Sequence, residues 1–324
     1  MNLIYKILSF LNVITLCLAM ICGNYPGFAA TELKYETAYG NPMKGFMPFY
    51  SEDGADSSVP YSMEWLYIPM TDLVADDGTF TLRDGLEEKL DKIARRGHQA
   101  AMRVYLDYPD KECAVPQYIW DMGVKKYEYS EYGGGISPDY SDQRLIDFLL
   151  DFIDQFALNY DGDKRIAYIT TGLIGHWGEW HVKYDEGIQR LPSEDVLEQY
   201  VAPYVDAFPN ASLLMRRPFS YVDAYGMGVY NDMTGEKEDT EEWLDWIKDG
   251  GSYRGPESPM KYTPVPHVWN HAPVGGEFTS GITMEEMLVT AQKRTLKLLE
   301  QSHMTFIGPK CPIACDEEKE YPRE

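Results

Sequence analysis

The sequence predicts an α/β fold, namely a (β/α)8 barrel that forms one domain from residue 31 to residue 324. Two observations support this prediction. Strand-like apolar runs alternate with amphipathic helices, which is typical of a parallel sheet with helical crossovers. Nearly 300 residues follow position 30, and a barrel of this kind takes about 250.

Eight short apolar segments are the predicted strands, which favours a closed barrel over an open sheet. A dinucleotide-binding open sheet also lacks its fingerprint here, because no Gly-x-Gly-x-x-Gly follows the first strand. The seventh strand is the least defined, since prolines interrupt the approach to it. The eight segments are residues 45–50, 63–68, 100–106, 166–172, 212–216, 227–231, a short one ending near Glu277, and 304–308.

Three helices are predicted from apolar residues spaced three and four apart. Residues 83–96 end in basic side chains and meet Gly97, where a left-handed cap is expected, and residues 141–160 form a longer helix. The third begins with a capping box between Thr283 and Glu286. The apolar faces are Leu86, Leu90, Ile93 and Ala94; Leu145, Phe148, Leu149, Phe152, Ile153 and Phe156; and Met287, Leu288, Ala291 and Leu298.

The first 30 residues have the features of a signal peptide. Lys6 precedes an apolar run at residues 7–21, and small residues follow it, with cleavage expected near Ala29 or Ala30. A membrane anchor is the alternative, but the run is shorter than the ~20 residues that span a bilayer. We therefore expect a secreted protein or a periplasmic, cell-envelope protein.

The chain carries 52 acidic and 29 basic residues, a net charge of −23. This charge makes nucleic acids and anionic membranes poor partners and fits a neutral or cationic substrate. No segment after residue 30 is long and apolar enough for a membrane span. Cys113, Cys311 and Cys315 follow the predicted leader, and this odd number predicts at most one disulfide rather than a framework.

In such a barrel the active site lies at the carboxyl ends of the strands, so polar and aromatic residues near these ends are candidate site residues. Most of them follow the third to sixth predicted strands, and one precedes the seventh. The candidate substrate-binding residues are Arg103, Asp107, His176, Trp177, Trp180, His181, Arg216, Asn231, Asp232 and Trp269.

The segment at residues 172–181 is the most informative for chemistry, because Trp177 and Trp180 flank Glu179 among three glycines. Apolar walls raise the pKa of a carboxyl group by desolvating its charged form, as a general acid near neutral pH requires. Indole faces also stack on sugar rings. The alternative is that both tryptophans pack at the barrel end and that Glu179 pairs with an arginine.

Glu277 supplies the second carboxylate that a glycosidase needs. The pair predicts Glu179 as the acid/base and Glu277 as the nucleophile, at the separation of about 5–5.5 Å typical of retaining enzymes. Arg216 is expected near the floor of the site, where it would hold Glu277 ionised, or else to form a structural ion pair.

Histidines at 176, 181, 267 and 271 raise a metal site as a competing interpretation. The His267-x-x-x-His271 pair resembles a helical zinc pair, but the prolines around it prevent the helix that would align the two rings. We therefore predict no metal and no cofactor.

Several motifs together resemble an uncharacterised family of exported bacterial proteins. They are residues 41–46 (NPMKGF), 62–65 (SMEW), 95–99 (RRGHQ), 103–109 (RVYLDYP), 175–181 (GHWGEWH) and 275–277 (GGE). The two halves of that family are catalogued as separate domains of unknown function, and its fold is grouped with the TIM-barrel glycosidases. The resemblance covers about residues 41–308 and implies the barrel, while the placement of the two glutamates is similar to that in a large clan of retaining glycosidases. Family members run on through a last helix, so we expect the eighth helix here to be missing or partial.

These observations predict an exported retaining glycoside hydrolase that cleaves a neutral glycan. The alternative from another class is a non-catalytic glycan-binding barrel that keeps the aromatic cleft without the chemistry.

Overall fold

In the computed structural model, residues 41–57, 59–183, 191–253 and 260–310 are described. Eight parallel strands form a nearly closed barrel in the order β1-β12-β11-β8-β7-β6-β3-β2, and bridges from Phe46 to Tyr61 and from Phe49 to Trp65 join its two ends. The predicted fold is therefore confirmed. The strands are β1 (Gly45–Phe46), β2 (Met63–Pro69), β3 (Gln99–Tyr105), β6 (Ile166–Thr170), β7 (Leu213–Met215), β8 (Gly228–Thr234), β11 (Val274–Phe278) and β12 (Phe306–Ile307).

The seventh barrel strand, β11, owes its position to two glycines. A Cβ atom at Gly275 would overlap the ring of Phe306 on β12, and one at Gly276 would overlap Thr234 and Met304. Only glycine lets β11 approach its neighbours so closely. The prolines before it therefore do not prevent the strand, which begins one residue after Pro273.

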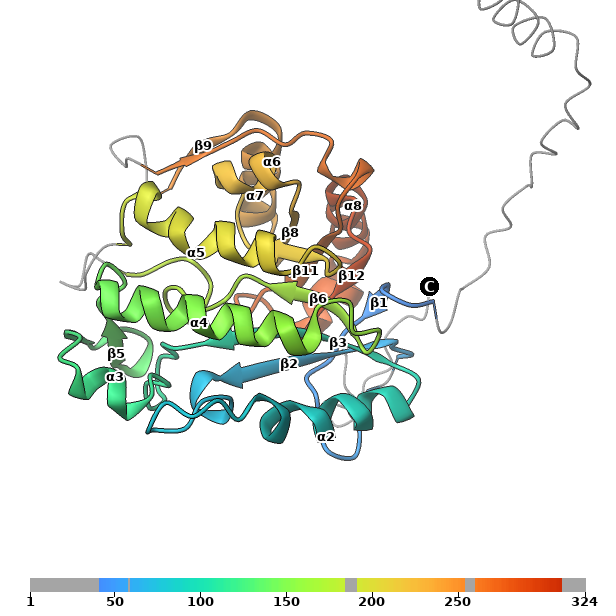
Figure 1. Cartoon of the computed structure of the whole chain (residues 1–324). Coiled ribbons are helices and arrows are strands. Elements are labelled where there is room, and N and C mark those ends of the chain that lie inside the picture. Colours follow the sequence, from blue (N-terminus) through green and yellow to red (C-terminus); the bar gives the residue numbers. More distant parts are fainter. Residues whose placement is uncertain (1–40, 58, 184–190, 254–259, 311–324) are drawn as a thin grey trace, which may run out of the picture. The chain divides into compact units, whose positions relative to one another are not determined.

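Helices cover the outside of the barrel, and Figure 1 shows α2, α4 and α5 along the side of β2, β3 and β6. The predicted helix at 83–96 is α2, with Gly97 in the left-handed region at φ 82°, and that at 141–160 is α4. The helices are α2 (Leu82–Arg95), α3 (Gln117–Asp121), α4 (Gln143–Tyr160), α5 (Glu194–Ala207), α6 (Ser220–Tyr225), α7 (Lys237–Asp249) and α8 (Gln292–Ser302).

The third predicted helix differs from the expectation. Thr283 does cap it, because the amide of Glu286 donates to its hydroxyl at 3.1 Å. The first turn is a π-helix, η5 (Glu286–Thr290), and Ala291 at φ −111° separates it from α8. The sequence pattern marks the apolar face correctly but does not reveal this interruption.

The core has two main layers. The larger lies between strands and helices, where the predicted apolar face of α4 is buried and that of α2 is buried except for Ala94, which is exposed. A smaller cluster fills the inside of the barrel and consists of Met47, Met63, Trp65, Ala101, Ala167, Tyr168, Leu214, Tyr230 and Phe306. Side chains therefore fill the inside of the barrel, and a binding site can form only at the ends of its strands.

Two hairpins are added to the barrel pattern. β4 (Lys126–Tyr129) and β5 (Gly135–Pro138) lie between β3 and α4, with the short turn η2 (Glu131–Gly133) at their tip. β9 (Gly251–Ser252) and β10 (Lys261–Tyr262) follow α7. The remaining short turns are η1 (Met70–Asp72) and η4 (Val268–Asn270).

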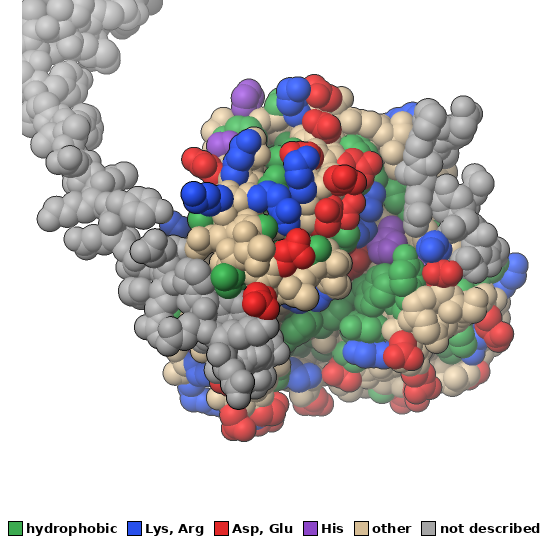
Figure 2. Space-filling view, turned by 180° about the vertical axis from the view of Figure 1, so that it is seen from behind, with side chains coloured by type: hydrophobic (Ala, Val, Ile, Leu, Met, Phe, Trp, Pro, Cys, Tyr) green, Lys and Arg blue, Asp and Glu red, His purple; other side chains and the backbone are tan. Residues whose placement is uncertain are grey.

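The surface mixes charges of both signs. Figure 2 shows acidic and basic side chains on both sides of a band of hydrophobic side chains on the face opposite to that of Figure 1. Within the described parts of the chain, no helix is long and apolar enough to cross a membrane. The predicted signal peptide, the expected partial eighth helix, Cys311 and Cys315 lie outside the described residues.

Candidate active site

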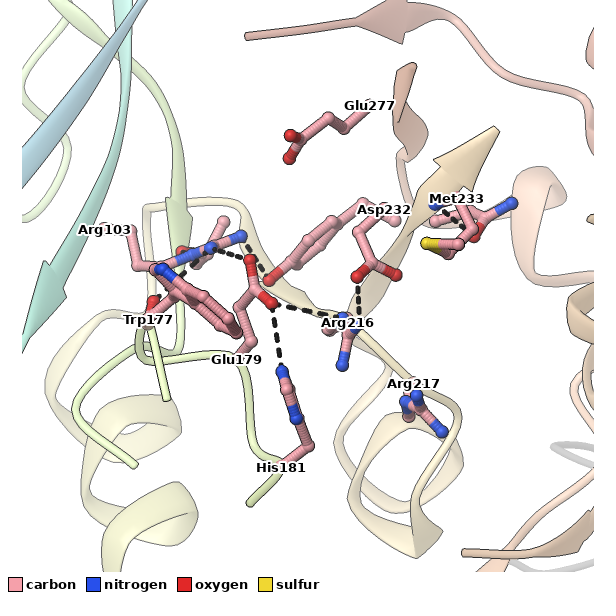
Figure 3. Close-up of polar contacts among 12 residues, drawn as sticks. Arg103, Trp177, Glu179, His181, Arg216, Arg217, Asp232, Met233 and Glu277 are labelled. Atoms are coloured by element: carbon pink, nitrogen blue, oxygen red, sulfur yellow. Dashed lines mark hydrogen bonds and ion pairs between the residues drawn. The ribbon is translucent and has the colours of Figure 1, made fainter. Parts of the chain in front are cut away.

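Charged side chains from five neighbouring parts of the barrel meet at the carboxyl ends of its strands (Figure 3). Arg103 comes from β3, Glu179 from the loop after β6, Arg216 from the residue after β7, and Glu277 from β11. Asp232 joins them from β8. Since the strands are parallel, their carboxyl ends gather these groups although the residues are far apart in sequence.

Glu179 is held by three cationic or polar groups. Its Oε1 accepts a hydrogen bond from Arg103 Nη1 at 2.9 Å, and its Oε2 lies 3.3 Å from His181 Nε2 and 3.7 Å from Arg216 Nε. Arg103 is only 2% exposed and also donates to the hydroxyls of Thr170 and Tyr230. The carboxylate therefore has a fixed position.

The pKa of Glu179 is lowered, contrary to the expectation from the sequence. Burial alone would raise this pKa, but the charge of Arg216, the hydrogen bond from His181 and the charge of Arg103 outweigh it. Burial, followed by the charge of Arg216, lowers the pKa of His181 to about 3. At neutral pH a neutral imidazole thus faces an ionised Glu179.

The two tryptophans also differ from the expectation, because they do not both lie against the carboxylate. Trp180 is buried against Phe219 and Tyr221, with ring centroids 6.3 and 6.2 Å away, and its indole N–H donates to backbone carbonyls at Thr171 and Gly172. Trp180 thus packs the barrel end, as the alternative interpretation had it. Trp177 is half-buried and lies beside Glu179 in Figure 3.

The glycines of this loop are required by close approach. A Cβ atom at Gly172 would overlap the carbonyl of Val104, and one at Gly175 would overlap the backbone of His181. Gly175 and Gly178 also have φ angles of 77° and 64°, which favour glycine. The tight turn that the sequence predicts is therefore present.

Glu277 has a different environment from Glu179. Among the described residues its ion-pair partner is Lys310, with Nζ 3.7 Å from Oε1, and the side chain of Glu277 is 18% exposed. Burial, and then the negative charge of Glu179, raise the pKa of Glu277 to about 7. In Figure 3 its side chain points toward the space above Glu179 and Asp232.

Arg216 does not pair with Glu277, contrary to one of the two expectations for it. Its Nη2 donates to Asp232 Oδ2 and its Nε faces Glu179. Burial lowers the pKa of Arg216, although Glu179 opposes this effect. Arg216 therefore acts on the carboxylate from the fourth barrel strand rather than on that from the seventh.

Asp107 and His176 form a buried pair behind the loop rather than a part of the open site. Asp107 Oδ2 lies 2.7 Å from His176 Nδ1, while Oδ1 accepts from the hydroxyl of Tyr129. His176 Nε2 accepts from the amide of Lys183 at 3.2 Å, which places the ring proton on Nδ1. These two candidates therefore brace the loop that carries Glu179.

The remaining candidates are divided between the two ends of the barrel. Asn231 is buried and accepts from the amide of Met233 at 3.0 Å. Trp269 precedes β11 and stacks on His303, which precedes β12, with ring centroids 3.8 Å apart. Because these strands are parallel, Trp269 lies at their amino ends, away from Glu179, which corrects its assignment as a substrate-binding residue.

His267 and His271 flank the short turn that carries Trp269, so they also lie away from Glu179. Across residues 41–57, 59–183, 191–253 and 260–310 no group of three or more His, Cys, Asp or Glu side chains is placed to hold a metal ion. Cys113 is a free thiol, and burial raises its pKa to about 12.

Two tyrosines in the site were missed from the sequence. The hydroxyl of Tyr67 on β2 donates to the carbonyl of Trp177, and the hydroxyl of Tyr230 on β8 accepts from Arg103. Both rings also lie near the Arg103 guanidinium, at 5.3 and 5.0 Å. Their place near the ends of two predicted strands was the available signal, but it does not separate them from ordinary core residues.

No family model and no curated protein matches this sequence. Solved structures do resemble it. Endo-glycoceramidase II from Rhodococcus sp. aligns with a TM-score of 0.51 and 10% identity over 84% of this chain and 75% of that one. Its lactosyl-enzyme intermediate gives a TM-score of 0.50 and 11% identity, covering 84% and 74% of the two chains.

Xylanase XynB from Paenibacillus barcinonensis aligns with a TM-score of 0.49 and 15% identity over 86% of this chain and 87% of that one. Identities this low describe the fold and not the chemistry. Membership in the family of exported bacterial proteins stays a prediction. The protein has the (β/α)8 barrel fold of the TIM-barrel glycoside hydrolases.

Proposed function

We propose that the protein is a glycoside hydrolase in which Glu179 and Glu277 are the catalytic pair. The observation that carries this proposal is that the two glutamates share one end of the barrel and have opposite pKa shifts. Two titratable groups whose surroundings push their pKa values apart are the usual arrangement for acid and base roles. Carboxylate pairs of this kind are what glycoside hydrolysis requires.

The surroundings favour roles opposite to those that strand position predicts. Two arginines and His181 keep Glu179 ionised, which suits a nucleophile or a carboxylate that stabilises positive charge on the sugar. Among the described residues Glu277 has only Lys310 as an ion-pair partner, and its pKa of about 7 suits a proton donor to the leaving oxygen. We therefore assign Glu277 as the acid/base and Glu179 as the nucleophile.

In the proposed reaction Glu277 protonates the glycosidic oxygen while Glu179 attacks the anomeric carbon. Water then enters, Glu277 takes its proton, and the glycosyl bond to Glu179 breaks. Arg103 and Arg216 stabilise Glu179 whenever it leaves as a carboxylate. This sequence retains the anomeric configuration and requires carboxyl groups about 5–5.5 Å apart.

Azide rescue separates the two assignments. With an activated aryl glycoside, azide should restore turnover of Glu277→Ala and give a glycosyl azide of retained configuration, because the covalent intermediate still forms. With Glu179→Ala the azide replaces the nucleophile, so the product should have inverted configuration. The configuration of the glycosyl azide is measured by NMR. An inverted product from Glu277→Ala and a retained product from Glu179→Ala would instead assign Glu179 as the acid/base and Glu277 as the nucleophile.

A second test compares the turnover of each variant with that of the parent protein. On unactivated substrates Glu277→Gln should turn over about 10²–10⁴-fold more slowly than the parent, since the transferable proton is lost. Glu300→Gln, an exposed change on α8, is the matched control and should leave turnover unchanged. If Glu179→Ala and Glu277→Gln both keep parental turnover, the paired-carboxylate mechanism is excluded.

A non-catalytic glycan-binding barrel is the second candidate, because Glu179 already has ion-pair partners in two buried arginines. That protein would bind oligosaccharides and hydrolyse none of them. We further propose a neutral glycan as substrate and action outside the cytoplasm, on the basis of the net charge of −23 and the signal-like first 30 residues.

A further inference from the structure

The hairpin of β4 and β5 places an exposed aromatic side chain beside the candidate active site. Tyr132 at the hairpin tip is 45% exposed, although most aromatic rings near the site are buried. Its ring centroid lies 4.9 Å from that of Trp177 at an interplanar angle of 62°. Trp177 is two residues before Glu179, and its carbonyl accepts from Tyr67 and from Arg103.

The hairpin tip is fixed to the rest of the site by several contacts. The amide of Asp110, in the loop after β3, donates to the carbonyl of Gly134 at 2.7 Å. Glu131 Oε2 lies 3.2 Å from Lys183 Nζ, which ties the tip to the loop after β6. At the end of β4, next to the tip, the hydroxyl of Tyr129 donates to buried Asp107. Tyr132 is therefore presented by a rigid support.

The backbone at both aromatic residues is in an unfavourable conformation. Tyr132 and Trp177 each have a φ angle of 55°, in the left-handed region that bulky side chains rarely adopt. Of the positive-φ residues other than glycine in the described chain, five of seven lie in the loops after β3 and β6. Such conformations are unfavourable and gather at binding and catalytic sites.

We propose that Tyr132 and Trp177 form a subsite for a sugar ring adjacent to the one that is cleaved, so that the ligand is an oligosaccharide. The inference rests on the proposed glycan-binding role of the site. Aromatic rings offer a flat apolar surface to the C–H groups of a pyranose. Tyrosine and tryptophan supply this area at low entropic cost when they are held rigidly. The contacts around the tip hold the rings in place despite the unfavourable backbone conformation.

Tyr132→Asn tests the subsite, because asparagine tolerates the left-handed conformation and removes only the ring. Tyr132→Phe keeps the ring. Tyr225→Asn is the matched control, since Tyr225 ends α6 just before β8, at the opposite end of the barrel. Calorimetry gives Kd for hexasaccharides of β-1,4-linked glucose, xylose and mannose and of α-1,4-linked glucose and galacturonate. Hydrolysis is followed on the same panel and on p-nitrophenyl glycosides of the matching monosaccharides.

Tyr132→Asn should raise Kd and KM for the bound hexasaccharide about 2- to 10-fold, the change expected for one aromatic contact. Its kcat/KM on the p-nitrophenyl glycoside should stay within about twofold of the parent, and Tyr132→Phe and Tyr225→Asn should match the parent on both substrates.

The subsite is excluded if Tyr132→Asn binds as tightly as the parent, or if the parent binds no hexasaccharide of the panel. An equal loss on the p-nitrophenyl glycoside would also exclude it and would assign Tyr132 to positioning of the loop. A parent that binds but hydrolyses nothing contradicts the proposed hydrolase, whereas the comparison of Kd values still decides the subsite.

Discussion

At the scale of single residues, the candidate site depends on how unevenly cations are shared between two glutamates. Arg103 and Arg216 both face Glu179, at 2.9 and 3.7 Å, whereas among the described residues Glu277 forms an ion pair only with the partly exposed Lys310. Burial acts on both carboxyl groups in the same direction. The opposite pKa shifts therefore arise from Arg216, His181 and Arg103 around Glu179 and from the charge of Glu179 beside Glu277, and not from a difference in apolar surroundings.

The first residue-scale prediction concerns pH. If Glu277 must be protonated and Glu179 ionised, kcat/KM should fall as pH rises through about 7, and its acid limb should lie well below pH 4.5. The pH profile of the parent on an oligosaccharide measures this. A basic limb that is unchanged in Glu277→Gln would show that another group controls it.

The same shift affects stability with a defined sign. A carboxyl whose pKa is higher in the folded than in the unfolded state binds more protons when folded, so its contribution to stability falls as pH rises from about 4.5 to about 7. The free energy of unfolding of Glu277→Gln, taken relative to that of the parent, should therefore be higher at pH 8 than at pH 5. Urea unfolding at both pH values measures this, and Glu300→Gln should show no such difference.

At the scale of elements, the loop at residues 172–181 departs most from a regular barrel connection. It turns sharply enough that Trp180 returns to pack on Phe219 while Glu179 faces the site. The amide of Trp177 donates to the carbonyl of Asp107, and the amide of His176 donates to the carbonyl of His181. Backbone hydrogen bonds therefore hold the loop in place. Rigid support of this kind is what a catalytic carboxylate needs.

Gly175 and Gly97 provide a matched test of this loop. Both have positive φ, 77° and 82°, so alanine at either site should cost about 1–2 kcal/mol from backbone conformation alone. At Gly175 the added Cβ atom would also overlap the backbone of His181, whereas at Gly97 it would meet no other atom. Gly175→Ala should therefore lower the free energy of unfolding by more than Gly97→Ala and should reduce turnover. Equal losses in urea unfolding would mean that the loop adjusts freely.

At the scale of the whole molecule, the barrel interior links strands from all parts of the sequence. Phe306 of β12 fills the space above Gly275 and stacks on Tyr168 of β6, with ring centroids 4.6 Å apart. The interior therefore joins strands that are not neighbours in the sheet, and barrel closure depends on it.

Phe306→Ala should destabilise the protein by about 3–5 kcal/mol, because it leaves a cavity where a buried aromatic ring packed. Leu158→Ala on α4 is the control, since Leu158 is 79% exposed and should change the free energy of unfolding by less than about 0.5 kcal/mol. Both values come from urea unfolding. A small loss at Phe306 would mean that β1 and β11 collapse into the space without cost.

The sequence by itself determined the barrel. Alternation of strands with helices, and apolar residues at spacings of three and four in α2 and α4, depend on local periodicity, which survives in any environment. It also identified the loop of Glu179 and the strand of Glu277, because glycines beside polar residues at strand ends are visible in the chain. Trp269 shows the limit, since nearness to a predicted strand does not say which end is near.

The tertiary structure decided which groups meet. Arg216 lies beside Glu179 and Asp232 instead of Glu277, Trp180 packs inward, and Asp107 and His176 are buried behind the loop. Tyr132 reaches Trp177 from a hairpin 45 residues earlier in the chain. These pairings depend on strand register and on side-chain direction across the barrel. A pKa depends on distances to charges on other strands, and local sequence patterns do not contain those distances.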